Sequence, residues 1–315
     1  MNFSREALQC VSTYVKHSLN REKYLLIINP VSGRGRTGRL IPYLQTLLDA
    51  NKIPYEFRIT TGPGQATELA KDAVGLGFGQ IVSVGGDGTA HEVVNGLIGS
   101  RVVFGMIPTG GGNDFPKAAG IPLEISKAVE TLANGFRRRV DVGLLGGRYF
   151  INGLGIGLDG AVSYRYRSMK LLRGEVGYIW GAVQEALIFK GFPVEIAIPD
   201  WSYNGLVLLI GASNGPSQGG DFKIAPDATI DDGLLDIHVI RDMPPLRRLI
   251  QIPKVRQGKH LSLEEVIIKR APWMEIGLEH MLPAHLDGES FLLEPGKHRV
   301  EVVPKALEVI SSIKE

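Results

Sequence analysis

The residues with the clearest potential for chemistry form a glycine-rich run around one acid, Gly85–Thr89 (GGDGT). The run follows an apolar segment typical of a buried strand and precedes a helical pattern, so loop amides and a helix N-terminus can receive phosphate oxygens. A carboxylate beside phosphates is repulsive without a cation, so Asp87 implies Mg²⁺ or a water bound to it. Thr89 and Glu92 also fit a capping box, and an ordinary turn is the alternative interpretation. The placement favours a nucleotide-phosphate site.

A second glycine cluster, Pro108–Asp114 (PTGGGND), follows the next predicted strand, and Asn113 or Asp114 can cap the helix after it. In an open parallel sheet, ligands bind outside the carboxyl ends of the strands. The glycine-bearing loops after the first, third and fourth predicted strands all fall on that edge. Three ordinary turns are the alternative, but the convergence of the loops favours a ligand site.

Two segments, Gly33–Gly38 and Gly155–Gly160, match the G-x-G-x-x-G pattern of dinucleotide-binding loops. In the first, Pro30 falls in the loop, and the second predicted strand ends at Thr60 without an acid to hold a ribose. The arginines of this loop suit phosphate contacts and a solvated basic loop equally well. The second segment lies at the start of the β-rich half, where we interpret it as a turn. We therefore reject a hydride-transfer function.

Acidic residues beside glycines recur in the C-terminal half. Asp231–Gly233 is typical of a hairpin turn between two strands, with a cation site as the lesser alternative. Asp287 and Glu289 flank a glycine in a similar stretch, which on its own also favours a turn over a catalytic pair. The 7 histidines of the chain show no metal-ligand spacing, and no Ser–His–Asp order stands out.

The elements that must position these residues change character along the chain. Up to about Asp141, short apolar runs alternate with amphipathic helical stripes, which predicts a mostly parallel sheet covered by helices. Beyond it, short β-rich runs separated by turns predict an antiparallel sandwich or barrel, interrupted by a helix around residues 176–187. We expect a helical extension at residues 1–23, an α/β domain at 24–141 to which 304–315 can return, and a β-rich domain at 142–303.

The composition is typical of a folded protein with more than one core. Of 315 residues, 44% are hydrophobic and 22% are charged, which excludes a disordered chain. The 35 Lys and Arg nearly balance the 33 Asp and Glu, which gives no support to a dedicated nucleic-acid binder. The single cysteine, Cys10, allows neither an intrachain disulfide nor a cysteine metal cluster and predicts a cytoplasmic location. The longest uncharged stretch, Trp201–Gly220, is too polar for a transmembrane helix.

Taken together and in this order, the motifs resemble those of the diacylglycerol kinase catalytic-domain family, which includes soluble bacterial lipid kinases and, more distantly, sphingosine kinases. The glycine–aspartate motif alone is shared with NAD kinases and phosphofructokinases, so the ordered set carries the specificity. The resemblance covers Tyr24 to Ser312. It implies a three-layer α/β domain of the NAD kinase and phosphofructokinase type, followed by an antiparallel β-sandwich. The matching segments are Asn29–Gly33, Thr60–Gly64, Gly85–Thr89, Pro108–Phe115 and Leu286–Glu289.

The resemblance also implies roles for single residues, with ATP and Mg²⁺ as cofactors. Asp87 would serve the metal–phosphate centre, Glu289 would be the general base on a lipid hydroxyl, and Asp287 would support it. The positions that match a structural Mg²⁺ site are the carboxylate of Asp232 and the backbone oxygens of Thr229 and Leu234. The residues expected near the nucleotide are Asn29, Thr60, Gly85, Gly86, Asp87, Gly88, Thr89, Ala90, His91, Gly110, Gly111, Asn113 and Asp114.

Two positions depart from the family pattern. Gly111 stands where the family often has a threonine, so a hydroxyl contact to the nucleotide is lost unless Thr109 replaces it. Gln65 stands where a histidine is common. Both departures bear on nucleotide affinity more than on the type of reaction.

The expected function is an ATP- and Mg²⁺-dependent transfer of the γ-phosphoryl group to the hydroxyl of diacylglycerol or a related lipid. Such an enzyme would be cytoplasmic and would reach the inner membrane surface transiently, and the resemblance allows a homodimer. Tyr164–Arg173 interleaves cations with aromatic and apolar residues, which suits an interfacial segment and a solvated helix equally. Two alternatives are an NAD kinase-like enzyme of a small molecule and a catalytically weak lipid- or nucleotide-binding regulator, suggested by Gly111.

Overall fold

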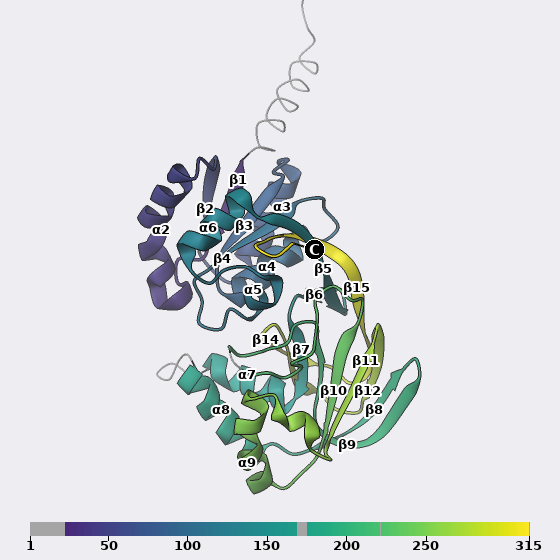
Figure 1. Cartoon of the computed structure of the whole chain (residues 1–315). Helices are drawn as coiled ribbons and strands as arrows, with labels where there is room; N and C mark the ends of the chain where they lie inside the picture. Colours follow the sequence, from purple (N-terminus) through teal and green to yellow (C-terminus); the bar gives the residue numbers. More distant parts are fainter. Residues whose placement is uncertain (1–22, 169–174, 221, 315) are drawn as a thin grey trace, which may run out of the picture. The chain divides into compact units, whose positions relative to one another are not determined.

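A computed structural model of the chain describes residues 23–168, 175–220 and 222–314, and Figure 1 shows its course. Nearly all of the expected extension at residues 1–23 lies outside the described residues, as does the part of Tyr164–Arg173 beyond Ser168. The chain divides into two compact units. Of the described residues, the first unit holds those up to Gly110, Ala119–Arg139 and those from Leu307 on, and the second holds those within Gly111–Ala118 and Val140–Ala306.

The first unit is built on a parallel sheet of β1 (Tyr24–Ile28), β2 (Tyr55–Ile59), β3 (Gln80–Gly85) and β4 (Val103–Pro108), joined by the end of β15 (Gly296–Ser311). The strands pair in the order β2–β1–β3–β4 (Figure 1). The end of β15 pairs in parallel with β4, where Glu308 lies beside Val103. Strand β4 is buried throughout, as expected when both faces of a parallel sheet are covered.

The helices of the first unit alternate with its strands as predicted: α2 (Ser32–Ala50), α3 (Gln65–Gly75), α4 (Asp87–Leu97) and α6 (Ile125–Asn134). Helix α5 (Asp114–Ala119) belongs to the second unit except for its last residue. Leu44 and Leu48 of α2 share a core with Val129 and Leu132 of α6 and with residues of the sheet. Helices α3 and α4 pack against each other. The alternating pattern in the sequence therefore predicts the α/β architecture correctly.

The predicted capping box at the start of α4 is not formed. Helix α4 begins directly after Gly86, its N-cap residue, so Thr89 lies inside the first turn. The carboxylate of Glu92 instead accepts hydrogen bonds from the backbone N–H groups of Gly64 and Ala66, at 2.9 and 3.1 Å. The motif fails because the helix starts earlier than the box requires, and Glu92 ties the loop before α3 to α4 instead.

The second unit is mostly antiparallel (Figure 1). Its strands are β5 (Phe136–Leu145), β6 (Arg148–Phe150), β7 (Gly153–Gly157), β8 (Phe192–Ile198), β9 (Trp201–Ser213), β10 (Leu235–Arg241), β11 (Val266–Ala271), β12 (Trp273–Leu278), β13 (Leu282–Leu286), β14 (Glu289–Leu293) and most of β15. They pair in the order β14–β13–β7–β9–β8–β12–β15, and β10 lies between β9 and β11. Apolar side chains of these strands form a hydrophobic core.

Helices of the second unit are α7 (Leu158–Ser168), α8 (Glu175–Ile188), α9 (Pro245–Arg256) and the 3-10 helix η1 (Lys259–Ser262). Helix α8 contacts both α7 and α9. No helix within the described ranges combines the length and the apolar character needed to cross a membrane.

Two interpretations of turns are wrong. Residues Gly153–Gly157 form strand β7, and helix α7 follows directly, so Gly155–Gly160 is not a turn. A Cβ atom on Gly155 would overlap Asp159 Oδ2 and lie 2.6 Å from His285 Nε2, so this glycine makes room for side chains. Asp231–Gly233 is not a tight hairpin either, because it ends a long connection between β9 and β10.

Candidate active site

The glycine loop between β3 and α4 is packed too tightly for side chains. A Cβ atom on Gly85 would lie 2.6 Å from Thr89 Cβ, and one on Gly86 would lie 3.1 Å from the Cα atom of Gly110. The N–H group of Thr109 donates to the Gly85 carbonyl at 2.8 Å. Glycine thus lets the loops after β3 and β4 run side by side at the carboxyl edge of the sheet.

The loop after β1 joins these two. Asn29 Nδ2 donates to Thr89 Oγ1 at 3.1 Å, and the hydroxyl groups of Thr37 and Thr109 lie 2.6 Å apart. Gly33 has a φ of 57°, and a Cβ atom on it would overlap the Thr109 carbonyl oxygen. The convergence predicted for the loops after the first, third and fourth strands is therefore present in the first unit.

The other residues of the first unit expected near the nucleotide lie around the same edge. The N–H group of Thr60 donates to the Ile28 carbonyl at 2.9 Å, which places Thr60 at the end of β1. Asp87 and Gly88 open helix α4, whose first N–H groups receive no side-chain cap from the described residues. The start of a helix without a side-chain cap offers N–H groups to an anion. The buried residues of its first turns are Thr89, Ala90 and His91.

Asp114 holds a loop of the second unit. Its carboxylate accepts hydrogen bonds from Ser217 Oγ at 3.0 Å and from the Gly220 N–H group at 2.8 Å, and Lys117 pairs with it at 3.8 Å. Asn113 before it is buried with a φ of 52°, in the left-handed region that asparagine tolerates. Asp114 therefore has a structural role in positioning backbone, whatever contact it makes with a nucleotide.

Gly111, the departure from the family pattern, is not required by crowding. A Cβ atom on Gly111 would meet no atom of the described chain within 4 Å. Its φ also lies outside the left-handed region, unlike that of Gly33. Because the backbone and the surrounding space both admit a side chain, a threonine could be accommodated here.

The turn between β13 and β14 brings Glu289 to the start of a strand. Asp287 and Gly288 have φ values of 51° and 87°, as a type I′ turn requires, and Leu286 pairs with Glu289 across the turn. Glu289 is half-buried at the first position of β14. The turn expected at this position is therefore present, and it fixes where the strand that bears Glu289 begins.

The carboxylate of Asp287 faces backbone. Its Oδ1 accepts the N–H groups of Asn152 and Gly153 at 2.8 and 2.9 Å, and its Oδ2 accepts that of Ile151 at 2.9 Å. The N–H group of Asp287 donates in return to the Gly153 carbonyl at 2.8 Å. Asp287 thus clamps the turn before Glu289 onto the loop between β6 and β7.

His285 connects the same turn with helix α7. Its Nδ1 accepts the N–H group of Gly288 at 3.2 Å, so Nε2 carries the proton and donates to Asp159 Oδ2 at 2.9 Å. Burial alone would lower the pKa of His285. The charge of Asp159, its hydrogen bond and the charge of Asp287 outweigh burial and raise that pKa above its ordinary value.

The residues expected to hold a structural Mg²⁺ share the loop before β10. Asp232 Oδ1 accepts the N–H group of Leu234 at 2.9 Å, and its Oδ2 accepts the hydroxyl of Thr229 at 2.6 Å and pairs with Arg270. A cationic side chain already lies against Asp232, so this carboxylate does not fit a Mg²⁺ ion unless Arg270 moves away. In the part of the chain that the structure describes, no group of three or more His, Cys, Asp or Glu side chains is arranged to hold a metal ion.

Two family models match most of the chain. Residues 23–145 match the "Diacylglycerol kinase catalytic domain", and residues 153–311 match the "YegS C-terminal NAD kinase beta sandwich-like domain". A diacylglycerol kinase from Bacillus subtilis (strain 168) is 33% identical over 293 residues, which cover 89% of this chain and 96% of that protein. This chain belongs to the diacylglycerol kinase catalytic-domain family. A Chromohalobacter salexigens protein named "Probable lipid kinase YegS-like" is 33% identical over 255 residues, or 79% of this chain and 81% of that protein.

A solved structure of the family agrees with this membership. The crystal structure of a diacylglycerol kinase from Bacillus anthracis str. Sterne matches with a TM-score of 0.71 at 25% identity, covering 92% of this chain and 97% of that one. Membership of the diacylglycerol kinase family confirms the two-part fold, an α/β half followed by a β-sandwich. The chain is therefore an enzyme of the lipid kinase class.

One buried acid was missed by the sequence analysis. Asp141 is fully buried in β5, where its Oδ2 accepts the N–H group of Gly233 and its Oδ1 accepts that of Lys305, both at 2.7 Å. Both donor residues have positive φ, so Asp141 stabilises two sharp bends of the backbone, one of them in the loop of Asp232. The available signal was an acid between two valines, Val140 and Val142.

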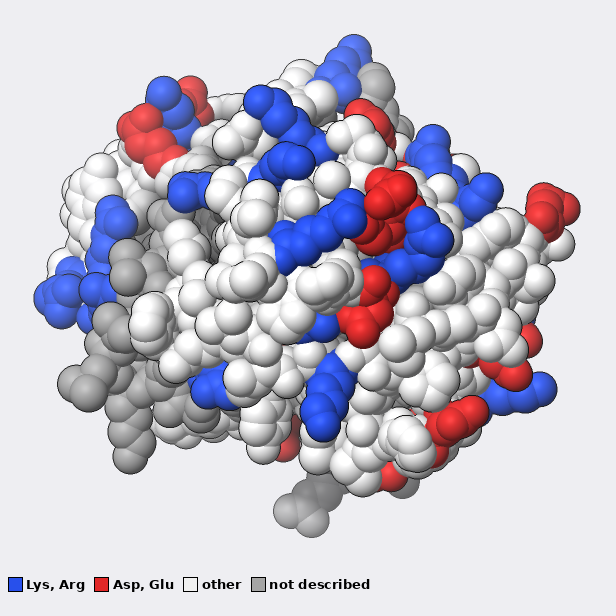
Figure 2. Space-filling model, turned by 90° about the horizontal axis from the view of Figure 1, so that it is seen from below, with Lys and Arg blue, Asp and Glu red and all other residues white. Residues whose placement is uncertain are grey.

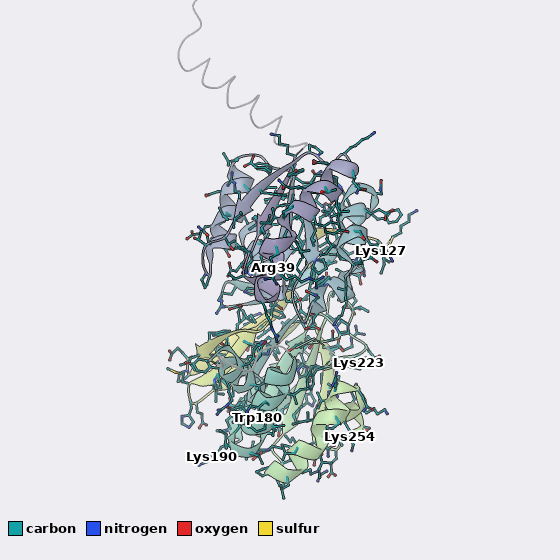
Figure 3. All side chains as sticks on the ribbon, turned by 90° about the vertical axis from the view of Figure 1, so that its left-hand side faces the viewer. Arg39, Lys127, Trp180, Lys190, Lys223 and Lys254 are labelled. Carbon is teal, nitrogen blue, oxygen red and sulfur yellow. The ribbon has the colours of Figure 1, made fainter. Side chains whose placement is uncertain are left out.

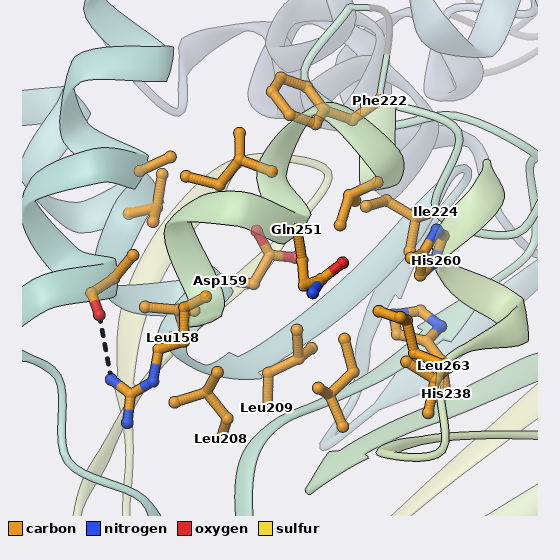
Figure 4. A pocket seen from close by; sticks show the side chains of 18 of the residues that line it. Leu158, Asp159, Leu208, Leu209, Phe222, Ile224, His238, Gln251, His260 and Leu263 are labelled. Atoms are coloured by element: carbon orange, nitrogen blue, oxygen red, sulfur yellow. Dashed lines mark hydrogen bonds between the residues drawn. The ribbon is translucent and has the colours of Figure 1, made fainter. Parts of the chain in front are cut away.

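The second unit also contains an apolar pocket that the sequence analysis did not predict (Figure 4). Its cavity volume is about 130 Å³, and it is lined by side chains of α7, α8, α9, β9 and β10. Two buried histidines, His238 and His260, line it, and a third, His285, adjoins it through Asp159. These histidines come from three different elements, so no linear spacing could have indicated that they meet.

Proposed function

We propose that this chain is an ATP- and Mg²⁺-dependent kinase that transfers the γ-phosphoryl group to a hydroxyl of diacylglycerol or a related lipid. The observation that supports a lipid is the apolar pocket, because it adjoins the hairpin that bears Glu289. Asp159 lines the pocket, and its hydrogen bond to His285 leads on to Gly288, the residue before Glu289. A lipid chain in the pocket would leave its polar end near that carboxylate.

The converging loops of the first unit would bind the nucleotide. Backbone N–H groups of Gly86–Thr89, at the start of α4, suit phosphate oxygens, and Asn29 and Thr60 lie at the same edge of the sheet. Asp87 offers the carboxylate that a phosphate-bound Mg²⁺ takes from a protein, the remaining ligands being phosphate oxygens and waters. When bound, the ion would neutralise negative charge on the transferred group.

Glu289 would be the general base that removes the proton from the lipid hydroxyl. It directly follows a turn that Asp287 holds through three backbone N–H groups. His285 adds a second tie to the same turn through Gly288. These contacts fix the backbone that bears Glu289, and a positioned base contributes about 10²- to 10⁴-fold to the rate.

The helices that form walls of the pocket also carry exposed apolar side chains. On α9, Leu246 and Ile250 are 72% and 67% exposed, and on α8, Trp180 and Ile188 are 49% and 61% exposed. The two helices contact each other, so these side chains belong to one region of the second unit. Exposed apolar groups around the walls of an apolar pocket suit an enzyme that takes its substrate from a lipid surface.

Cations accompany this apolar region. Lys254 and Arg256 are exposed on α9, and Lys190 is exposed just after α8. Figure 3 labels Trp180, Lys190 and Lys254 on the second unit, and Figure 2 shows Lys and Arg side chains among uncharged ones on the face seen from below. Such a mixture suits the headgroup layer of an anionic membrane, and we propose that α8 and α9 make the transient membrane contact. In Tyr164–Arg173, by contrast, Arg165 is paired with Glu185.

Phosphate transfer from γ-labelled ATP to lipids in mixed micelles with Mg²⁺ tests the proposal. Glu289→Gln and Asp87→Asn should each lower the yield of labelled lipid at least about 10²-fold. Glu294→Gln makes the same chemical change at an exposed glutamate a few residues away and should keep the wild-type rate. Labelled NAD without labelled lipid would overturn the lipid assignment and favour an NAD kinase-like enzyme. Binding of ATP without transfer to any acceptor would favour a regulator.

A further inference from the structure

The pocket in the second unit contains polar side chains, although its walls are mostly apolar. His238 lies on β10, Gln251 on α9 and His260 on η1, and we refer to these three residues as the polar cluster. Figure 4 shows Gln251 near Asp159 in the middle of the pocket, with His238 and His260 close together at one side. The proposed lipid kinase function does not by itself explain why an apolar pocket should contain such groups.

His238 is held in the pocket by a glycine on the neighbouring strand. It pairs with Gly211 of β9, and a Cβ atom on Gly211 would overlap the His238 ring. Only 1% of His238 is exposed, and within the described chain neither ring nitrogen has a hydrogen-bond partner of normal geometry. Because an unsatisfied buried polar group costs free energy, a ligand or a water is expected to pair with this ring.

The other two members of the polar cluster present acceptors. The His260 ring donates to the Ile224 carbonyl, so its second nitrogen, Nδ1, is an acceptor when the ring is neutral. Among the described residues, neither His260 Nδ1 nor Gln251 Oε1 has a hydrogen-bond partner. Both atoms are buried and need a donor that the described chain does not supply.

Burial keeps the two imidazoles neutral near pH 7. It lowers the pKa of His238 to about 4, against the opposing charge of Asp159, and it also lowers the pKa of His260. A neutral imidazole has one donor and one acceptor, so each of the three residues of the polar cluster presents a buried acceptor that lacks a partner among the described residues. An ester carbonyl supplies no donor, and a carboxylate would in addition be repelled by Asp159. A hydroxyl group supplies a donor and an acceptor together.

We propose that this pocket binds an aliphatic chain that carries a hydroxyl group, and that the polar cluster forms hydrogen bonds with that hydroxyl. The inference rests on the proposed function, because it takes the pocket as the site of the acceptor lipid, and it narrows that lipid to a hydroxylated class. This hydroxyl is not the one that receives phosphate. It replaces the water that would otherwise satisfy the polar cluster, while the rest of the chain lies against the apolar walls.

The first test measures binding without catalysis. The probes are long-chain alcohols with and without a second, mid-chain hydroxyl, beginning with ricinoleyl and oleyl alcohol and extended to a positional series of hydroxystearyl alcohols. Displacement of a fluorescent fatty alcohol from the full chain gives each Kd. We expect the best diol to bind about three- to tenfold more tightly than its matched mono-alcohol. Equal Kd values across the series would overturn the proposal.

Variants identify the groups responsible. His238→Leu and Gln251→Met should each bring the ratio of the two Kd values close to one by weakening the diol alone. His280→Leu makes the same change at an exposed histidine and should keep the wild-type ratio. If His238→Leu does not fold, as judged by thermal melting, the ratio measured for Gln251→Met tests the assignment to the polar cluster. A preference that survives in a folded His238→Leu and in Gln251→Met would contradict the assignment to the polar cluster.

Activity on matched acceptors separates this inference from the proposed function. Monoricinolein and monoolein are offered with labelled ATP, and we expect a higher kcat/KM for monoricinolein that His238→Leu abolishes. A binding preference for diols with no phosphorylation of either lipid would support the pocket and overturn the kinase proposal. Equal binding together with equal phosphorylation would support the kinase proposal and overturn the hydroxyl preference.

Discussion

The expected ligand site of the first unit is formed by backbone, and that of the second unit is formed by side chains. In the first unit the edge is built of backbone, because Gly33, Gly85 and Gly86 let three loops approach closely. In the second unit the pocket is defined by side chains, such as Asp159 and His238, that come from separate elements. A backbone site has to be encoded as a run of glycines, whereas a side-chain site needs only one residue from each element. The first kind is therefore visible in a sequence, and the second is not.

The largest effect is expected from adding one methyl group to the backbone site. In Gly85→Ala the new Cβ atom would lie 2.6 Å from Thr89 Cβ, so the loop has to move. A displacement of this kind should lower phosphoryl transfer about 10²-fold and raise the Kd for ATP at least about tenfold. Calorimetric titration with a non-hydrolysable ATP analogue and the labelled-lipid assay measure the two effects.

Gly75→Ala is the matched control for this change. A Cβ atom on Gly75, at the end of α3, meets no described atom within 4 Å. The variant should keep its activity and gain about 0.5–1 kcal/mol of stability from the better helix former. A fully active Gly85→Ala would show that the edge tolerates side chains. The claim that this edge depends on glycine backbone would then be wrong.

The next effect should come from removing the carboxylate of Asp287, which holds the turn before Glu289. Asp287→Ala leaves the N–H groups of Ile151, Asn152 and Gly153 without their acceptor, which should cost roughly 3 kcal/mol of stability. The turn before Glu289 also loses its clamp, so kcat should fall more than KM rises. Urea unfolding and the labelled-lipid assay report the two, with the exposed Asp200→Ala as control. Unchanged stability would show that the turn is held by other contacts.

Acid should destabilise the second unit through its buried histidines. The pKa of His238 is about 4 in the folded chain against 6.5 for an ordinary histidine, so the unfolded state binds a proton first. The contribution to stability is therefore complete above pH 6.5 and is lost as the pH falls toward 4, by up to about 3 kcal/mol. His260 acts in the same direction. His285 has the opposite effect on stability, because its pKa is raised. Its contribution to stability is present at low pH and is lost as the pH rises through the raised pKa.

Urea unfolding between neutral pH and about pH 4.5 measures this dependence. Replacing His238 by leucine should flatten the fall in stability, because the side chain that resists protonation is gone. The exposed His280→Leu should retain the wild-type slope. Identical slopes in all three proteins would contradict the assignment of the effect to His238.

A smaller effect, in the direction of improvement, is expected at Gly111. The space there admits a side chain, so Gly111→Thr can restore the hydroxyl that the family often has. One additional neutral hydrogen bond should lower the Kd for ATP about three- to tenfold. Gly111→Val has nearly the same shape without the hydroxyl and is the control. Equal gains in both variants would mean that the effect comes from the backbone and not from a hydroxyl contact.

The smallest effect is expected at Asp232. Its partner Arg270 is 44% exposed at the side chain, so Asp232→Asn should cost only about 0.5 kcal/mol. Without nucleotide, Mg²⁺ should leave the Tm of the wild type and of Asp232→Asn unchanged. A Tm that rises with Mg²⁺ in the wild type alone would instead support a metal ion held by Thr229, Asp232 and Leu234, with Arg270 displaced.

Much of the fold could be predicted because its signals are local. Alternating strand and helix patterns indicated the parallel half, and the run Gly85–Thr89 indicated the edge of the sheet where its loops converge. The capping box failed because the start of α4 is set by Gly86 and by the loop that Glu92 binds. Strand β7 was mistaken for a turn because of the glycine at position 155. This position requires glycine because side chains of other elements leave no room for a Cβ atom, and the neighbouring sequence does not reveal that crowding.

By itself, the sequence determined the family motifs, the order of the two halves and the glycine-built edge, because each depends on residues close together in the chain. Only the tertiary structure decided that His238, Gln251 and His260 share one pocket, and that the carboxylate of Asp287 binds three backbone N–H groups. Those contacts join residues from separate elements. Their geometry depends on strand register and side-chain direction, which the spacing of residue types along a chain does not encode.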